Sequence, residues 1–258
     1  MVRSSGSHPL SITKAGGKDI SDCKLCAWLC KWACGNDAGE FNRWLWKQSD
    51  DLERTSTGNL WEKEPNKERA TQVYTIRQND PDAAHPMLID LAEKGSPWAM
   101  ETLAVDYESG RDVALDLTQA MQWYHRAVCA GSWFATIGYA RVLTKLGYHK
   151  ECDAVLEDGA NKGYIPAYFW LAWYRLKLSK SRKTYRKVQP LLEKAASEGH
   201  LAAQRFLALY MARGRFGLRH VPHGIKLFRT FLSTASEDWE AQKRLGTEAH
   251  NGHDRGEE

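Results

Sequence analysis

The sequence predicts an all-α protein made of about four stacked helix hairpins, preceded by a short helical extension. One observation is a glycine followed four residues later by an alanine, and another is an apolar helical face that begins at each alanine. The third is a second helical pattern that follows at a nearly constant distance. A repeat period of this length is typical of helix-hairpin arrays. The glycine–alanine pairs, whose alanines lie 36, 32 and 36 residues apart, are Gly95–Ala99, Gly131–Ala135, Gly163–Ala167 and Gly199–Ala203.

The first helix of each repeat begins near its alanine. Counted from that alanine, positions i, i+4 and i+5 are small or apolar in all four repeats, as in Ala99, Leu103 and Ala104. Residues at these positions share one face of a helix. We therefore expect four first helices that bury this face.

The second helix of each repeat has a small or apolar residue followed three and four residues later by large ones. In the first repeat these are Ala120, Trp123 and Tyr124, and Ala120 lies 21 residues after Ala99. The third and fourth repeats keep the distance of 21 residues, whereas the second repeat needs only 17. Its helix–helix connection, near Gly147, is therefore expected to be shorter.

The stretch AMQWYHRAVCAG around Trp123 shows why small and large side chains alternate. Ala120 and Ala127 let two antiparallel helices approach closely, while Trp123 and Tyr124 fill the groove beside them. Gly131 is expected to end the helix in the left-handed conformation. A single hairpin cannot cover its own apolar faces, so successive hairpins are expected to stack.

The ends of the array are expected to be single helices that cap it. Residues 81–95 have the pattern of a lone second helix, and residues 238–249 that of a lone first helix with a polar exterior. Atypical terminal elements are usual in repeat arrays. Within the third repeat, Pro190 falls in the expected second helix and indicates a late start or a kink there.

The first repeat has the most specific pattern in the chain, and it is carried by Ala99, Leu103, Ala104, Tyr107, Gly110, Val113, Asp116, Ala120, Trp123, Tyr124, Ala127 and Gly131. In these residues the chain resembles the Sel-like repeat branch of the tetratricopeptide-type α/α solenoids. Asp112 stands where the second glycine of that family's turn is usual. The resemblance implies a right-handed α/α solenoid over residues 81–252 and a non-catalytic adaptor or scaffold with a concave binding face.

Residues 21–80 are predicted to form a helical extension rich in cysteine and tryptophan. We expect disordered tails at 1–20 and 253–258, on either side of the extension and the solenoid. Trp44, Trp46 and Trp61 are expected in short helices packed on the first repeats. Four cysteines spaced three, four and four residues apart share one stripe of a helix, namely Cys23, Cys26, Cys30 and Cys34.

Three interpretations of this cysteine stripe remain open. The stripe fits an apolar face docked on the array or on a partner. It also fits an interfacial helix, with acylated cysteines, through which residues 21–34 contact a membrane. Four thiolates suit zinc or an iron–sulfur cluster as well, but ligands strung along about three turns of one helix cannot all reach one ion. Metal binding is therefore the least favoured of the three.

The sequence contains no recognisable motif for catalysis or cofactor binding. It lacks a nucleotide-binding glycine loop, an HExxH helix, a GxSxG elbow and a paired-carboxylate motif. No Cys, Asp or Glu is placed to complete a metal site with either of the pairs His220/His223 and His250/His253. We therefore expect neither an enzyme nor a cofactor. Without a secretory signal or a membrane-spanning stretch, a cytoplasmic location is expected.

Charge is distributed unevenly along the chain. Residues 175–229 hold 14 basic side chains and only two acidic ones, whereas residues 81–174 hold 7 basic and 12 acidic ones. A solvated basic face is one explanation, but so many like charges repel one another and favour an anionic partner. An acidic protein segment fits best, phosphoinositide-rich membrane is an alternative, and nucleic acid is less favoured because no stacking platform is evident.

We predict that partner-binding residues come from two successive helix–helix connections and from the concave face. Stacking of the repeats is expected to place the two connections side by side along one rim. The predicted residues are Arg182, Lys183, Arg186 and Lys187 in the third repeat, Arg213, Arg215 and Arg219 in the fourth, and Tyr168 and Trp173 on the concave face. The function expected from these features is a protein-interaction scaffold. A membrane-associated regulator tethered by residues 21–34 and a cysteine-ligated metal protein are the alternatives.

Overall fold

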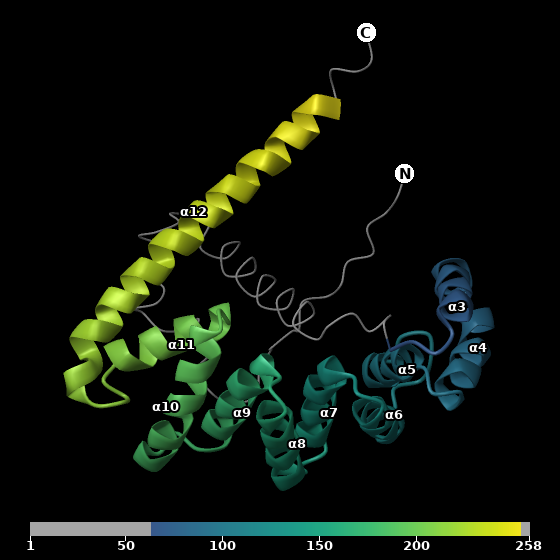
Figure 1. Cartoon of the computed structure of the whole chain (residues 1–258), viewed down its shortest axis with the longest axis horizontal. Coiled ribbons are helices and arrows are strands. Elements are labelled where there is room, and N and C mark those ends of the chain that lie inside the picture. Colours follow the sequence, from purple (N-terminus) through teal and green to yellow (C-terminus); the bar gives the residue numbers. More distant parts are fainter. Residues whose placement is uncertain (1–62, 254–258) are drawn as a thin grey trace. The chain divides into compact units, whose positions relative to one another are not determined.

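The computed structural model describes residues 63–253, with side chains as far as residue 238, and this part of the chain is all helical (Figure 1). It contains ten α-helices, one short 3-10 helix and, within these residues, no strand. The predicted all-α solenoid class is confirmed. The predicted tails at 1–20 and, after His253, at 254–258 lie outside the described residues, as do the cysteine stripe and Trp44, Trp46 and Trp61.

The described chain divides within α11 into two compact units, which are treated separately. In residues 63–203, neighbouring helices of the sequence pack on one another from α3 to α10. The helices are α3 (Lys67–Asn79), α4 (Pro81–Glu93), α5 (Pro97–Ser109), α6 (Leu117–Cys129), α7 (Trp133–Lys145), α8 (His149–Asn161), α9 (Ile165–Leu178) and α10 (Arg182–Ser197). Helix α11 (Leu201–Ala212) spans the division, and η4 (Leu218–His220) and α12 (Val221–His253) follow it.

The first helices of the repeats lie on the inner side of this row. Besides packing on its own second helix, α5 contacts α7, and α7 contacts α9. The second helices approach one another less closely. A row of hairpins in which one set of helices is closer together curves toward that set, so α5, α7 and α9 line the concave side.

Each second helix ends, and the next first helix begins, through the same backbone hydrogen bonds. At the end of α6, the Gly131 N–H donates to the Val128 carbonyl at 3.0 Å and the Ser132 N–H donates to the Ala127 carbonyl at 2.9 Å. This pattern needs a left-handed residue, and Gly131 has φ +87°, as predicted. Ser132 then caps α7, because its hydroxyl accepts the Ala135 N–H at 3.2 Å.

Asp112 takes over the role of the turn glycine that the family pattern places there. Its φ is +62°, and among the described residues it is the one non-glycine residue with a positive φ. Aspartate tolerates this conformation better than most residues. Its carboxylate also lies 3.3 Å from the Arg77 guanidinium, so an aspartate gives this turn an ion pair that glycine would not.

Small residues are buried where helices approach most closely. The alanines that open the four first helices are fully buried, as are Ala120 and Ala127 of α6. A methyl group added at Gly138 in α7 would overlap the ring of Tyr124 in α6. In the second unit, a methyl group at Gly224 would overlap the backbone at Ala212. The predicted alternation of small and large side chains is therefore present in the core.

The prediction that a single separate helix caps each end of the array is wrong. Residues 81–95 do not form a lone helix, because α4 pairs with α3, which buries Ala70 and Val73. Residues 238–249 do not form a separate helix, because α12 continues without a break from Val221 to His253. The predicted late start at Pro190 is also wrong: α10 begins at Arg182 and contains the proline in its interior.

None of the helices described for residues 63–253 has both the length and the apolar character that spanning a bilayer requires. The boundaries predicted for the tails and the extension stay predictions.

The substitution Gly138→Ala is expected to lower the free energy of unfolding by about 1–3 kcal/mol. Tyr124 is buried and its hydroxyl donates to Glu108, so the ring cannot move aside without losing that bond. Chemical denaturation measures the change. Gln122→Ala, at an exposed position of α6, is the control and should change stability by less than about 0.5 kcal/mol. Equal stability of Gly138→Ala and wild type would contradict the close packing.

Candidate functional site

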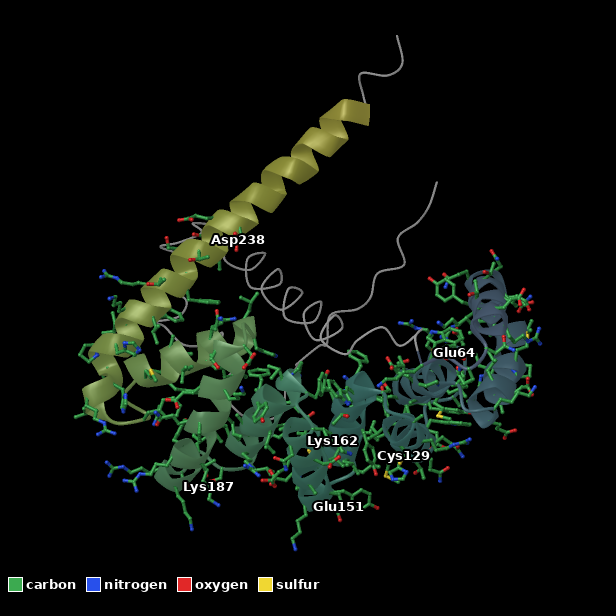
Figure 2. All side chains as sticks on the ribbon, in the orientation of Figure 1. Glu64, Cys129, Glu151, Lys162, Lys187 and Asp238 are labelled. Atoms are coloured by element: carbon green, nitrogen blue, oxygen red, sulfur yellow. The ribbon has the colours of Figure 1, made fainter. Side chains whose placement is uncertain are left out.

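Four of the predicted partner-binding residues form an exposed basic cluster, defined as Arg182, Lys183, Arg186 and Lys187. They occupy the first two turns of α10. Within the described residues, none of their charged groups makes an ion pair or a side-chain hydrogen bond. Figure 2 shows Lys187 projecting away from the ribbon into solvent. The cluster is therefore accessible and electrostatically unsatisfied.

The local sequence places these four side chains on one solvent-facing side of a stable helix. The Ser181 hydroxyl caps α10 by accepting the Thr184 N–H at 3.1 Å. Tyr185 and Val188 are buried on the opposite face, which leaves Arg182 and Arg186 outside. Residues four apart on a helix are neighbours, so like charges at such positions repel each other. The positive end of the helix dipole adds to this repulsion.

Other basic residues of the same stretch are already engaged within the repeat. The Arg175 guanidinium holds the Asp153 carboxylate with two hydrogen bonds of 2.7 and 2.6 Å, and Glu157 lies 3.5 Å away. The hydrogen bond to Asp153 is the main reason why the pKa of Arg175 is raised. The Lys177 ammonium lies 5.1 Å from the centre of the Trp173 ring. The excess of basic residues in the composition thus overstates the charge that is free for a partner.

The two aromatic residues predicted for the concave face are half-buried in α9. Trp173 packs edge-on against Tyr174 at 4.9 Å and against Trp170 at 5.6 Å between ring centres. It is therefore part of an aromatic cluster that keeps one edge accessible beside Lys177. Tyr168 lies one turn earlier on the same helix. Their role in binding stays a prediction.

The remaining predicted residues belong to the second unit, in the connection between α11 and α12. Burial lowers the pKa of Arg213, and the neighbouring charge of Arg215 lowers it further. The Arg219 guanidinium donates to the imidazole of His220 at 3.0 Å. Arg213 and Arg215 are thus close enough for their charges to interact, whereas the contact of Arg219 is with His220. That this connection lies beside the basic cluster of α10 stays a prediction, because the two units are described separately.

A buried ionic network on the concave side was not predicted from the sequence. Glu108, near the end of α5, accepts hydrogen bonds from the Tyr124 hydroxyl at 2.9 Å and from the Lys145 ammonium at 2.8 Å. The Arg141 guanidinium binds both of its carboxylate oxygens. Arg141 and Lys145 come from α7, so the network joins two successive first helices.

The charges in this network stabilise one another. Burial alone would raise the pKa of Glu108, but the hydrogen bonds and charges of Arg141 and Lys145 outweigh it and lower the pKa. Burial is the main reason why the pKa of Tyr124 is raised well above its ordinary value. Glu108 lies four residues after the buried Ala104, so it shares the apolar face of α5. That position was the sequence signal for a buried, paired carboxylate.

A second ion pair links the preceding first helix to α5. The Arg77 guanidinium at the end of α3 lies 2.6 Å from the buried carboxylate of Asp106 and 3.3 Å from Asp112. Burial raises the pKa of Asp106, although the hydrogen bond and charge of Arg77 oppose the shift. Together with the Glu108 network, this pair connects α3, α5 and α7 along the concave side.

Two cysteines lie in the described repeats. Cys129 is exposed, with its sulfur 3.9 Å from the Nε2 of His125. Cys152 is buried, and burial raises the pKa of its thiol, while the Thr144 hydroxyl donates to its sulfur at 3.4 Å. In the part of the chain that the structure describes, no group of three or more His, Cys, Asp or Glu side chains is placed to hold a metal ion. The four cysteines predicted as candidate ligands lie outside it.

Solved structures show where this arrangement of helices is found. A Sel1 repeat protein from Oxalobacter formigenes is similar with a TM-score of 0.53 and 18% identity, over 74% of this chain and 81% of that chain. A protective antigen present in uropathogenic Escherichia coli strains, which displays an SLR fold, is similar with a TM-score of 0.51 and 18% identity. The match covers 85% of this chain and 57% of the antigen. No protein-family profile and no curated protein sequence matches the chain.

At 18% identity, these structural similarities are evidence for the fold alone. This chain is a helical repeat protein with the Sel1-repeat architecture, as the residues of its first repeat predicted.

The substitution Glu108→Gln is expected to lower the free energy of unfolding by about 3 kcal/mol near neutral pH. This is the lower end of the range for a broken buried ion pair, because Arg141 and Lys145 remain partly exposed to water. The folded pKa lies below the ordinary value of 4.5, so the stabilisation is present above about pH 4.5 and is lost as the pH falls through the lower folded pKa. Urea denaturation of both proteins across this pH range measures the difference.

Glu157→Gln is the matched control for this measurement. Glu157 is exposed and its distance to Arg175 is 3.5 Å, so its loss should cost less than about 0.5 kcal/mol at any pH. A difference between wild type and Glu108→Gln that stays constant down to strongly acidic pH would contradict the role assigned to the network.

Proposed function

We propose that this protein is a non-catalytic scaffold that binds an acidic segment of a partner protein through the basic cluster of α10. The observation that carries the proposal is a set of four exposed cations that have no partner among the described residues. They lie at the end of a helix where positive charge is least favourable. Folding alone gives no reason to place Arg182, Lys183, Arg186 and Lys187 there.

The electrostatic penalties at the start of α10 are large enough to favour binding of an acidic partner. Each like-charged pair four residues apart costs roughly 0.2–0.5 kcal/mol, and each cation in the first turn costs roughly 0.3–1 kcal/mol. Carboxylates of a partner would remove both penalties and add charge-assisted hydrogen bonds. Binding therefore gains what the free protein loses at this helix end.

The array supports binding of this kind because it is preorganised. The Glu108 network and the pair of Arg77 with Asp106 link successive first helices, so the concave side is held in one arrangement before a partner arrives. A rigid surface loses little conformational entropy on association. The basic cluster lies toward one end of residues 63–203, which would favour one orientation of a charged partner along the array.

The membrane-tethered alternative depends on residues 21–34, which lie outside the described residues, and it stays a prediction. The same holds for the expected cytoplasmic location.

Reversing the cluster with Arg182→Glu, Lys183→Glu, Arg186→Glu and Lys187→Glu is expected to abolish binding to acidic ligands and leave the helix content unchanged. The probe is a fluorescent peptide of alternating glutamate and serine, followed by anisotropy. Loss of four exposed ion pairs of roughly 0.7 kcal/mol each predicts an affinity about 100-fold lower. Circular dichroism checks the fold, and added salt should weaken wild-type binding.

A matched pair of double variants separates a local effect from a change in overall charge. Arg182→Glu with Lys183→Glu changes the first turn of α10, and Lys67→Glu with Arg69→Glu makes the same change in the first turn of α3. Only the α10 pair should weaken binding. Equal affinities of wild type and the quadruple variant at physiological salt would refute the proposal.

A further inference from the structure

We propose that the edge of the array leading to the basic cluster is a docking surface for an extended acidic segment that also carries apolar side chains. The proposal rests on the function proposed above and adds the apolar part of the partner. It begins from large hydrophobic residues that the array leaves in solvent. In residues 63–203 these are Tyr74, Leu115, Tyr148 and Leu178.

Three of these four residues occupy the same place in successive hairpins. Leu115, with 63% of its surface exposed, lies in the connection from α5 to α6, and Tyr148, 48% exposed, lies between α7 and α8. Leu178, 56% exposed, ends α9 just before α10. We call these three residues the corner row. In the second unit the corresponding connection, from α11 to α12, presents Leu218 with 84% of its surface exposed.

The corner row lies along one edge of the array. In an array of antiparallel hairpins all first helices point the same way, so their C-terminal ends meet at one edge. Because α5 contacts α7 and α7 contacts α9, successive connections are about one helix-packing distance apart, roughly 10 Å. The three side chains thus lie at successive connections along this edge.

Local folding does not explain why these residues are apolar. Tyr148 is the N-cap of α8 and makes no side-chain capping hydrogen bond, whereas Asp116 and Ser181 cap α6 and α10. Replacing a capping side chain in this way costs about 1 kcal/mol. Leu115 and Leu178 likewise leave more than half of their surface in water. Single exposed apolar residues are common on protein surfaces, but these three recur at the connections of successive hairpins and lead to the basic cluster.

The charges along the same edge indicate where a bound segment carries its own charged residues. Leu178 lies four residues before Arg182, so the corner row runs directly into the basic cluster. At the other end, Asp112 and Asp116 lie near Leu115 in the sequence. Asp112 pairs with Arg77 and Asp116 caps α6, so no cluster of available cations is present at this end. A complementary partner therefore has its carboxylates at the end that meets α10 and fewer of them near Leu115.

The distance between successive connections indicates the backbone conformation of the bound segment. A polyproline II segment is an extended chain with three residues per turn and a rise of about 3.1 Å per residue. Residues three apart therefore lie on the same side of the segment and roughly 9 Å from each other, which is close to the roughly 10 Å between connections. An apolar residue at every third position then meets each member of the corner row in turn. The inferred ligand is an extended protein segment with three such residues followed or preceded by a run of acidic ones.

Synthetic peptides test the inference on the full-length chain. The leucine probe has leucine at every third position among serines, three leucines in all, joined to four glutamates, and is made in both orders. The serine probe replaces the leucines by serine, and the basic probe replaces the glutamates by lysine. Fluorescence anisotropy should show that one leucine probe binds about tenfold or more tighter than the serine probe, since each leucine buries apolar surface.

Variants locate the contact. Leu115→Ser, Tyr148→Ser and Leu178→Ser together should remove the preference for the leucine probe and leave the affinity for the serine probe unchanged. Tyr74→Ser is the matched control, because Tyr74 is 49% exposed but lies in the middle of α3, outside the corner row. Thermal unfolding of each variant confirms that it folds, and the serine probe reports an intact basic cluster in the same sample.

The outcomes distinguish the two proposals. If the leucine and serine probes bind wild type equally, or if the triple variant keeps the preference, the docking surface is refuted while the acidic-segment scaffold stands. If the basic probe binds as tightly as the acidic ones, the proposed function fails and this inference fails with it. A preference that is lost in the triple variant and kept in Tyr74→Ser establishes the corner row.

Discussion

Close approach between first and second helices is the constraint on which the rest of this structure depends. Gly138 leaves room for the ring of Tyr124, and the buried alanines do the same along each repeat. Because the ring is held there, its hydroxyl reaches Glu108, and that carboxylate in turn holds Arg141 and Lys145 of the next repeat. Packing of small against large residues therefore also sets the positions of buried charges, and through them the spacing of the concave side.

The charged residues of the array divide into two groups by what they contact. Arg77, Arg141 and Arg175 each lie against a carboxylate and connect helices. The basic cluster at the start of α10 has no such contact among the described residues, although it belongs to the same basic stretch of sequence as Arg175. Net charge of a segment is thus a poor guide to a binding surface, whereas the presence or absence of an internal partner separates structural cations from available ones.

The repeat, its helix faces and its turn glycine could be predicted from the sequence, because they depend on spacing within one hairpin. Gly131 is left-handed where a helix must end, and Ala99 is buried where helices meet. The pairing of α3 with α4 was missed, since residues 67–79 lack the small-residue pattern of the other first helices. The partners of Glu108 lie 33 and 37 residues away, and such a pairing follows from stacking, which no local pattern reveals. The predicted binding role of Tyr168 and Trp173 rests on their helical spacing and stays a prediction.

The links between first helices also determine how this array can change in length during evolution. Repeat proteins commonly gain or lose whole units by duplication or deletion, since each unit contacts only its neighbours. Deleting α5 and α6 from this chain would remove Asp106 and Glu108 together and leave Arg77 and Arg141 without their carboxylates. Inserting a unit between α6 and α7 would separate Glu108 from Arg141 with the same result. These ion pairs therefore disfavour a change in the number of repeats between α3 and α7. Variation in length is expected at positions outside α3 to α7.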